Sequence, residues 1–203
     1  MVDIGQRLWR RNLVAANDGN LSARLPDGTI LCTPTGASKG AMTEGMLAVV
    51  TTDGDVVSTG TGRGPSSEIA MHLRAYRVDP AIGAVVHAHP PYATAFAIRG
   101  ESLRGDLMTE TLTELPEVPL AGFATPGTAE VPDAIAPLVP GHRACLLEFH
   151  GALTWGAALE EAYLTMERLE SLAQTTATLR MIGGERRLGA ERIDHVRRVL
   201  AGR

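Results

Sequence analysis

The stretch Ala84-Val85-Val86-His87-Ala88-His89-Pro90-Pro91-Tyr92-Ala93-Thr94-Ala95-Phe96 decides both the fold and the position of the functional site. The apolar, β-branched run from Ile82 to Val86 predicts a buried strand, and the two prolines end it. Side chains alternate between the two faces of a strand, so His87 and His89 are expected on the same face. The prolines suit the first turn of a helix, which we expect to follow. Two imidazoles at a strand exit favour a metal site, although two unrelated histidines would give the same pair.

A third histidine stands at the end of another predicted strand. His150 follows the apolar run 144–149 and precedes Gly151, a residue that permits close approach of the backbone. Three histidines with one open coordination position are typical of a catalytic metal, because a structural site closes its fourth position. The other histidines are expected on the surface or in satisfied core positions: His72, His142 and His195.

The order of predicted elements indicates an α/β protein. Helical and strand-like segments alternate along the chain, but hairpin turns at 26–28 and 53–54 exclude an all-parallel sheet. We therefore predict a three-layer α/β/α or α+β arrangement, in which helices flank a central mixed, mostly antiparallel sheet. One helix is expected to begin at Ser66 as its N-cap, and the segment 100–117 is expected to be irregular. Residues 1–203 are expected to form a single domain.

Composition narrows the classes of partner and chemistry. The formal net charge of −4 gives no reason to expect nucleic acid or an anionic membrane as a partner. No apolar run reaches membrane-spanning length and the start lacks a signal-peptide pattern, so the cytoplasm is expected. Cys32 and Cys145 lie in apolar runs and are expected to be buried, inert thiols. Lys39 is the only lysine, and its position in a polar Gly/Ser loop argues against a desolvated Schiff-base amine.

Three turns or helix starts combine small polar side chains with outward-facing backbone N–H groups. Such places bind phosphate through amides and the helix dipole, although ordinary turn or cap chemistry would give the same pattern. Glu68 is the candidate acid/base, since partial burial near a metal would let it hold or release a proton. Its alternative role is a first-turn carboxylate that complements the helix dipole. The candidate phosphate-binding residues are Asn20, Thr35, Gly36, Ser66 and Ser67.

From the first helix to about Gln174, the chain resembles the class II aldolase/adducin family. The resemblance is carried by six motifs in order: Gly19-Asn20-Leu21-Ser22, Thr33-Pro34-Thr35-Gly36, Pro65-Ser66-Ser67-Glu68, His87-Ala88-His89, Ala124-Thr125-Pro126-Gly127-Thr128 and His150-Gly151-Ala152.

The resemblance implies a class II aldolase-like fold and a zinc ion held by His87, His89 and His150. A three-histidine site also accepts Mn²⁺, Fe²⁺ or Co²⁺. The family resemblance further implies that Glu68 is the acid/base and that the five candidate residues named above bind the phosphate of a small sugar substrate. Family members are typically homotetramers with active sites at subunit interfaces, so the same assembly is expected here.

The chain departs from the fuculose-phosphate aldolases of this family at two tyrosines. One place, after the paired histidines, holds Met108, and no tyrosine follows Tyr163. Glu110 lies in a segment suited to reach a neighbouring subunit's site, and dehydratase relatives use a glutamate from about there. Dehydratases generally lack the Ser-Ser-Glu motif, however, so Glu68 favours aldolase chemistry.

The resulting hypothesis is metal-dependent cleavage of a phosphorylated ketose, similar to L-fuculose 1-phosphate, to dihydroxyacetone phosphate and an aldehyde through an enediolate. A sugar-phosphate 4-epimerase, a dehydratase or a decarboxylase of a sugar-acid phosphate remains open on the same scaffold. A cupin-type metalloenzyme would need a glutamate shortly after the paired histidines, and residues 90–97 contain none. An adducin-like interaction module is the non-enzymatic alternative, although loss of the metal ligands would then be expected.

Overall fold

The computed structural model describes residues 1–201 and contains one eight-stranded sheet in the order β4-β3-β2-β1-β5-β10-β9-β8. Neighbouring strands are antiparallel except β8 and β9, which confirms the predicted mixed, mostly antiparallel sheet. The sheet strands are β1 (Asn20–Arg24), β2 (Ile30–Cys32), β3 (Ala48–Val50), β4 (Val56–Thr59), β5 (Ala84–Ala88), β8 (Leu120–Ala121), β9 (Ala144–Leu147) and β10 (Gly151–Gly156).

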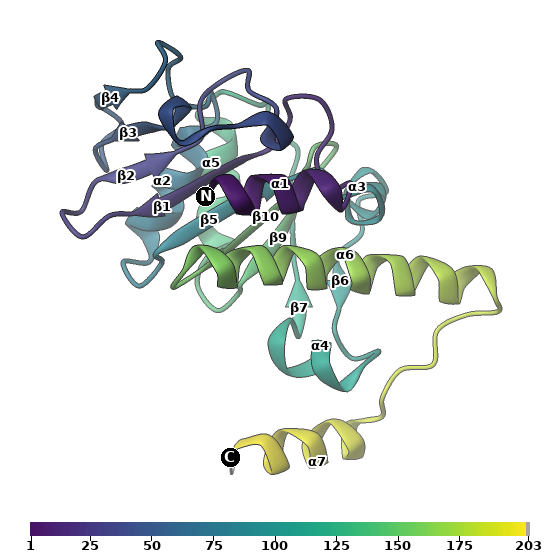
Figure 1. Cartoon of the computed structure of the whole chain (residues 1–203). Helices are drawn as coiled ribbons and strands as arrows, with labels where there is room; N and C mark the ends of the chain where they lie inside the picture. Colours follow the sequence, from purple (N-terminus) through teal and green to yellow (C-terminus); the bar gives the residue numbers. More distant parts are fainter. Residues whose placement is uncertain (202–203) are drawn as a thin grey trace.

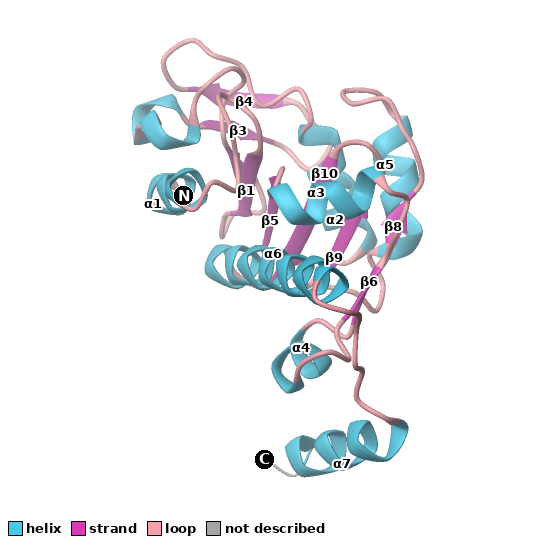
Figure 2. Ribbon diagram, turned by 90° about the vertical axis from the view of Figure 1, so that its right-hand side faces the viewer, coloured by secondary structure: helices cyan, strands magenta, loops and turns pink. Residues whose placement is uncertain are grey.

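Helices cover both faces of this sheet, so the three-layer α/β/α architecture is confirmed (Figures 1 and 2). α1, α3 and α6 lie on one face, and α2 and α5 lie on the other. The helices are α1 (Val2–Arg10), α2 (Ile69–Val78), α3 (Pro91–Ile98), α4 (Thr109–Glu114), α5 (Glu130–Ile135), α6 (Leu159–Met181) and α7 (Ala190–Ala201), with short 3₁₀ turns η1 (Lys39–Ala41), η2 (Glu44–Met46) and η3 (Ala136–Leu138).

The central strand β5 shows why both faces are apolar. Val86 packs into the cluster beneath α6, whereas Val85 packs into the cluster beneath α2. A strand that is buried on both faces has no polar side, and this accounts for the continuous apolar run seen in the sequence. His87 follows on the same face as Val85, so β5 delivers its imidazole to the layer that contains α2.

Two expected helix boundaries were wrong. The helix predicted to begin at Ser66 begins at Ile69, so Ser66 is not its N-cap. The Ser66 hydroxyl instead accepts a hydrogen bond from the Glu68 N–H at 3.3 Å and closes a local turn. The apolar spacing of residues 2–16 predicts an opening helix over that range, but the helix ends at Arg10, because Asn12 and Ala16 adopt positive φ angles of 57° and 44°.

The segment expected to be irregular contains some regular structure. A two-stranded ribbon of β6 (Leu103–Arg104) and β7 (Glu117–Val118) encloses α4. α4 and the C-terminal α7 project together from one side of the molecule (Figures 1 and 2). Within the described residues, no helix is long and apolar enough to span a membrane.

Candidate active site

Three imidazoles converge where β5 ends and β10 begins. The Nε2 atoms of His87 and His89 are 3.1 Å apart, and the candidate ligand atoms of these two residues and His150 all lie within 4.8 Å of one another. The ring centroids are separated by 4.7 to 5.0 Å. Residues separated by 63 positions in the chain therefore meet at one point, as a shared metal ligand set requires.

His87 is fixed by the sheet. Its ring is fully buried, and its Nδ1 lies 2.9 Å from the carbonyl oxygen of Ala152 on the neighbouring strand β10. A carbonyl only accepts, so Nδ1 carries the proton and the lone pair of Nε2 is directed toward the other histidines. Burial, with a smaller effect of His89 and His150, lowers the pKa of His87, which keeps the ring neutral as a metal ligand must be.

His150 is presented by the tight turn between β9 and β10. Phe149 has a φ angle of 55° in this turn, a conformation that is uncommon for a residue with a side chain. A Cβ atom on Gly151 would lie 2.6 Å from both the Ala88 carbonyl oxygen and the His89 ring. Only glycine fits there, so the close approach predicted from the His150-Gly151 pair brings His150 to the paired histidines.

Glu68 faces this cluster from the residue that precedes α2. Its Oε1 lies 3.2 Å from His150 Nε2, and its Oε2 lies 3.5 Å from His87 Nε2. Asn20 donates a hydrogen bond from Nδ2 to Oε2 at 2.9 Å and so fixes the carboxylate. The Glu68 side chain as a whole is 17% exposed, so a small molecule can reach it. Glu68 precedes the first turn of α2 and its side chain makes no capping hydrogen bond, so its contacts with the histidines favour the acid/base role over the helix-dipole role.

The donor set fits a divalent ion. Among the described residues, Glu68 Oε1 makes no hydrogen bond of good geometry, despite lying 3.2 Å from His150 Nε2, and His150 Nδ1 has no partner; both atoms are buried, a costly situation unless a ligand completes the site. Three imidazole nitrogens with a carboxylate beside them are ligands that zinc and similar divalent metals accept. His87, His89 and His150 would hold the ion, and the nearby carboxylate is free to take part in proton transfer.

A pocket with a volume of about 260 Å³ opens beside the cluster. All five residues expected to bind phosphate line this pocket together with Glu68, His89 and His150. Gly36 adopts a φ of 66°, the left-handed conformation that turns backbone amides toward an anion. The fold thus gathers segments that begin near residues 20, 35 and 66 around one cavity, with the histidine cluster at its edge.

The geometry is matched by similarity to known proteins. Residues 1–177 match the family described as Class II Aldolase and Adducin N-terminal domain. The chain belongs to the class II aldolase/adducin family.

Members of this family with different reactions resemble the chain closely. A 3-oxo-tetronate 4-phosphate decarboxylase from Escherichia coli O6:H1 is 36% identical over 191 residues, covering 92% of this chain and 86% of that protein. An L-fuculose phosphate aldolase from Methanococcus vannielii is 33% identical over 174 residues, with coverages of 85% and 91%. The crystal structure of YgbL from Escherichia coli superposes with a TM-score of 0.89 at 32% identity, covering 97% and 95% of the two chains.

Two pocket residues of this class II aldolase-family chain were missed in the sequence. Asp18 lies with its Oδ2 3.6 Å from His89 Nδ1, and it precedes the Gly19-Asn20 motif directly. Lys39 also lines the pocket, and its side chain is buried rather than exposed in a polar loop as expected. The prediction that the polar loop leaves Lys39 solvated was therefore wrong. The amine nevertheless donates hydrogen bonds to two carbonyl oxygens.

The remaining titratable candidates lie elsewhere. His72 is buried and bonded through Nδ1 to the Ser22 hydroxyl at 2.7 Å, and burial lowers its pKa to about 3. This histidine is therefore a buried core residue as expected, although its Nε2 has no hydrogen-bond partner among the described residues. Both cysteines are free and buried, and burial raises the pKa of Cys32 to about 11 and that of Cys145 to about 12, so these thiols are inert at neutral pH.

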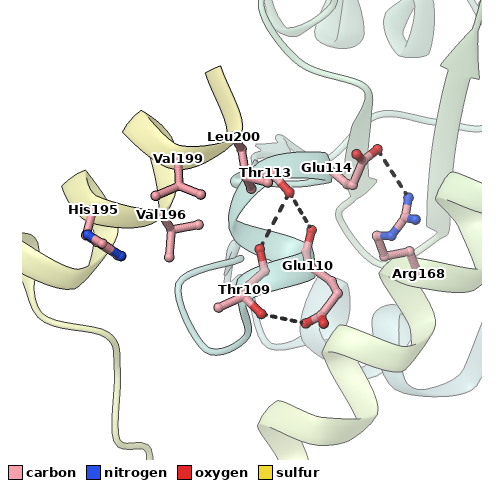
Figure 3. Close-up of a pocket in the computed structure, with 9 residues that line it drawn as sticks. All are labelled: Thr109, Glu110, Thr113, Glu114, Arg168, His195, Val196, Val199 and Leu200. Atoms are coloured by element: carbon pink, nitrogen blue, oxygen red, sulfur yellow. Dashed lines mark hydrogen bonds and ion pairs between the residues drawn. The ribbon is translucent and has the colours of Figure 1, made fainter. Parts of the chain in front are cut away.

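Glu110 is not brought to the histidine cluster within one chain. It lies on α4, in a groove of about 530 Å³ that α4 forms with α7 and Arg168 (Figure 3). Hydrogen bonds from its own backbone and from Thr109 lower the pKa of this fully exposed carboxyl. Its role in a neighbouring subunit's site remains a prediction.

Proposed function

We propose that the chain is a metal-dependent decarboxylase of a phosphorylated 3-oxo sugar acid, with 3-oxo-tetronate 4-phosphate as the reference substrate. The observation that carries this proposal is a site with a metal-ligand cluster, the Glu68 carboxylate beside it and an anion pocket, but no tyrosine among its described lining residues. The similarity to the decarboxylase from Escherichia coli O6:H1 supports the same choice.

Decarboxylation and aldol cleavage share most of their chemistry. In 3-oxo-tetronate 4-phosphate, the bond between C1 and C2 breaks and its electrons form an enediolate across C2 and C3. Protonation at C2 then gives dihydroxyacetone phosphate. Cleavage of a ketose 1-phosphate releases the same enediolate, so one scaffold serves both reactions. A bound divalent ion would supply Lewis-acid stabilisation of the negative charge on the enediolate.

The departing group distinguishes the two reactions. An aldehyde leaves only after the hydroxyl on the neighbouring carbon loses its proton, so aldol cleavage needs an additional proton acceptor. Carbon dioxide leaves from a carboxylate without any proton transfer. Met108 stands where the family's fuculose-phosphate aldolases have a tyrosine, and no tyrosine follows Tyr163. The position held by Met108 therefore offers no hydroxyl that could accept this proton, which favours the reaction that does not need the transfer.

We assign the protein's own groups as follows. Asn20, Thr35, Gly36, Ser66 and Ser67 bind the phosphate, and their amides and hydroxyls orient the substrate toward the histidine cluster. Glu68 takes up a proton from solvent and passes it to C2 of the enediolate, from the position where Asn20 holds its side chain.

The decisive assay compares two substrates with the zinc-loaded protein. We expect release of CO₂ together with dihydroxyacetone phosphate from 3-oxo-tetronate 4-phosphate, with kcat/KM at least about tenfold above that for L-fuculose 1-phosphate. Dihydroxyacetone phosphate formed more efficiently from L-fuculose 1-phosphate, without CO₂ from the acid, would instead establish the aldolase. The similarity to the Methanococcus vannielii aldolase keeps that reaction as the second candidate.

The proposed assembly is a homotetramer with active sites at subunit interfaces. Two observations support it: Glu110 lies outside the histidine pocket of its own chain, and the projecting α7 exposes the apolar residues Val199 and Leu200. We infer that a partner subunit covers these two residues. Light scattering should give four times the 21.5 kDa chain mass. A monomer at micromolar concentration would contradict this arrangement.

A further inference from the structure

Lys39 is a buried cation that none of the steps above uses. It is the only lysine in the chain, and it is just 1% exposed even though lysine side chains usually lie on the surface. The Nζ atom donates hydrogen bonds to the carbonyl oxygens of Asn17 at 2.9 Å and Ala37 at 2.6 Å. These two carbonyls belong to different loops that line the pocket, the turn 17–20 and the loop 34–38. Lys39 therefore holds the two loops together.

Two carbonyl oxygens of the loop 34–38 accept hydrogen bonds from cationic side chains. Lys39 binds the Ala37 carbonyl, and Arg63 donates to the Gly36 carbonyl at 2.8 Å. In a trans peptide the N–H points opposite to the preceding carbonyl, so the N–H groups of Ala37 and Ser38 point away from these cations. Neither N–H has a hydrogen-bond acceptor among residues 1–201. Gly36, which lines the pocket, is left-handed, and free amides beside such a glycine are available as donors to an anion.

The charge of Lys39 is also placed to act on the pocket. It is the only lysine or arginine among the described lining residues, and the charged groups that face it are the carboxylates of Asp18 and Glu68. An ammonium group has three N–H donors, and the two carbonyls use two of them. A phosphate that enters the pocket thus meets one basic side chain against two acidic ones.

We propose that Lys39 sets the phosphate affinity of this pocket, by clamping loop 34–38 against turn 17–20 and by supplying the basic charge among the lining side chains. The inference rests on the proposed function, because that function assigns the pocket to the phosphate of the substrate. A lysine that only stabilised the fold would affect the melting temperature and leave anion binding by the folded protein unchanged.

The test uses Lys39→Met, which preserves the length of the side chain but removes its donors and charge, and Lys39→Arg, which retains both. Inorganic phosphate is titrated calorimetrically into zinc-loaded protein, and again after chelation so that binding to the ion is separated. We expect Lys39→Met to raise the Kd for phosphate about 10- to 100-fold, with Lys39→Arg closer to wild type. Arg24→Met is the matched control, since that half-buried cation also donates to two carbonyl oxygens, those of Ile82 and Tyr76, but does not line the pocket, and it should change the Kd less than about threefold.

The same variants predict a particular change in turnover. Phosphate contacts are made before and during the reaction, so their loss should raise KM more than it lowers kcat. A phosphate Kd for folded Lys39→Met equal to that of wild type would overturn the role of Lys39 and leave the proposed decarboxylase intact. Failure of the wild type to bind phosphate would overturn the phosphate pocket and, with it, this inference.

A pH series keeps the proposal testable if Lys39→Met does not fold. Burial lowers the pKa of Lys39 to about 8, and the charges of Asp18 and Glu68 oppose part of that effect. The ammonium is therefore lost as the pH rises through about 8. Binding of sulfate, whose charge is constant in this range, should weaken between about pH 7 and 9.5 in wild type. In Lys39→Arg it should stay constant, because arginine remains protonated. A wild-type profile that is flat over this range would overturn the proposal.

Discussion

Glu68→Gln is expected to lower kcat by a factor of about 10²–10⁴ while the protein still binds its metal. Glutamine has nearly the shape of glutamate and accepts the hydrogen bond from Asn20 through its amide oxygen, but it cannot give a proton to the enediolate carbon. Substrate binding depends on the anion pocket and the ion, so KM should change much less than kcat. The reason for the loss is a missing proton donor rather than a rearranged site.

Glu185→Gln provides the matched control for this experiment. The Glu185 side chain is 15% exposed, close to the 17% of Glu68, but its ion pairs with Arg180 and Arg187 lie outside the pocket. Its kcat should equal that of wild type within about twofold. Metal content is measured on every sample, since a Glu68→Gln protein that had lost its metal would not report on proton transfer. A metal-loaded Glu68→Gln enzyme with unchanged kcat would remove Glu68 from the mechanism.

The second large effect is expected from His150→Ala, which should weaken metal binding by more than about 100-fold and reduce turnover to background. Loss of a partner behind a metal ligand already costs about 10–100-fold in affinity, and loss of a ligand itself should cost more. His150 is the suitable target because it lies in a turn and is 11% exposed, whereas His87 is fully buried in the central strand. Alanine at residue 150 should therefore leave the sheet folded.

Thermal unfolding separates metal loss from misfolding. A ligand at 1,000 times its Kd stabilises the folded state by about 4 kcal/mol, so chelation should lower the Tm of wild type by several degrees. It should leave the Tm of His150→Ala unchanged, since that variant has little metal to lose. His142→Ala is the control, because His142 bonds to the Leu138 carbonyl away from the cluster and should bind metal normally. Full metal content in His150→Ala would exclude this residue as a ligand.

Much of the fold could be predicted because local patterns and tertiary structure agree in the strands. The run before His87 is continuously apolar since β5 is buried on both faces, and the prolines that follow it begin α3 as expected. The predicted start of α2 was wrong because Ser66 forms a local turn with the Glu68 N–H, and the preceding residue is bridged to Pro34, about 30 positions earlier in the chain. Such a long-range contact leaves no periodic signal in the sequence.

The environment of Lys39 shows most clearly what sequence reasoning could not reach. Glycine and serine neighbours predicted an exposed loop, but α1 packs directly on η1, and the loops around residues 17 and 37 enclose the amine. Burial thus depends on α1 and on the turn at residue 17, which lie apart from Lys39 in the chain. The metal cluster was easier to predict, because two of its histidines share one strand exit and the third is marked by the glycine that lets it approach.

X-ray absorption at the metal edge of the zinc-loaded protein tests the central claim most directly. We predict one ion per chain, with three imidazole nitrogens at about 2.0–2.1 Å and oxygen ligands completing the shell. A shell that contains sulfur, or that holds fewer than three imidazoles in the wild type, would contradict it.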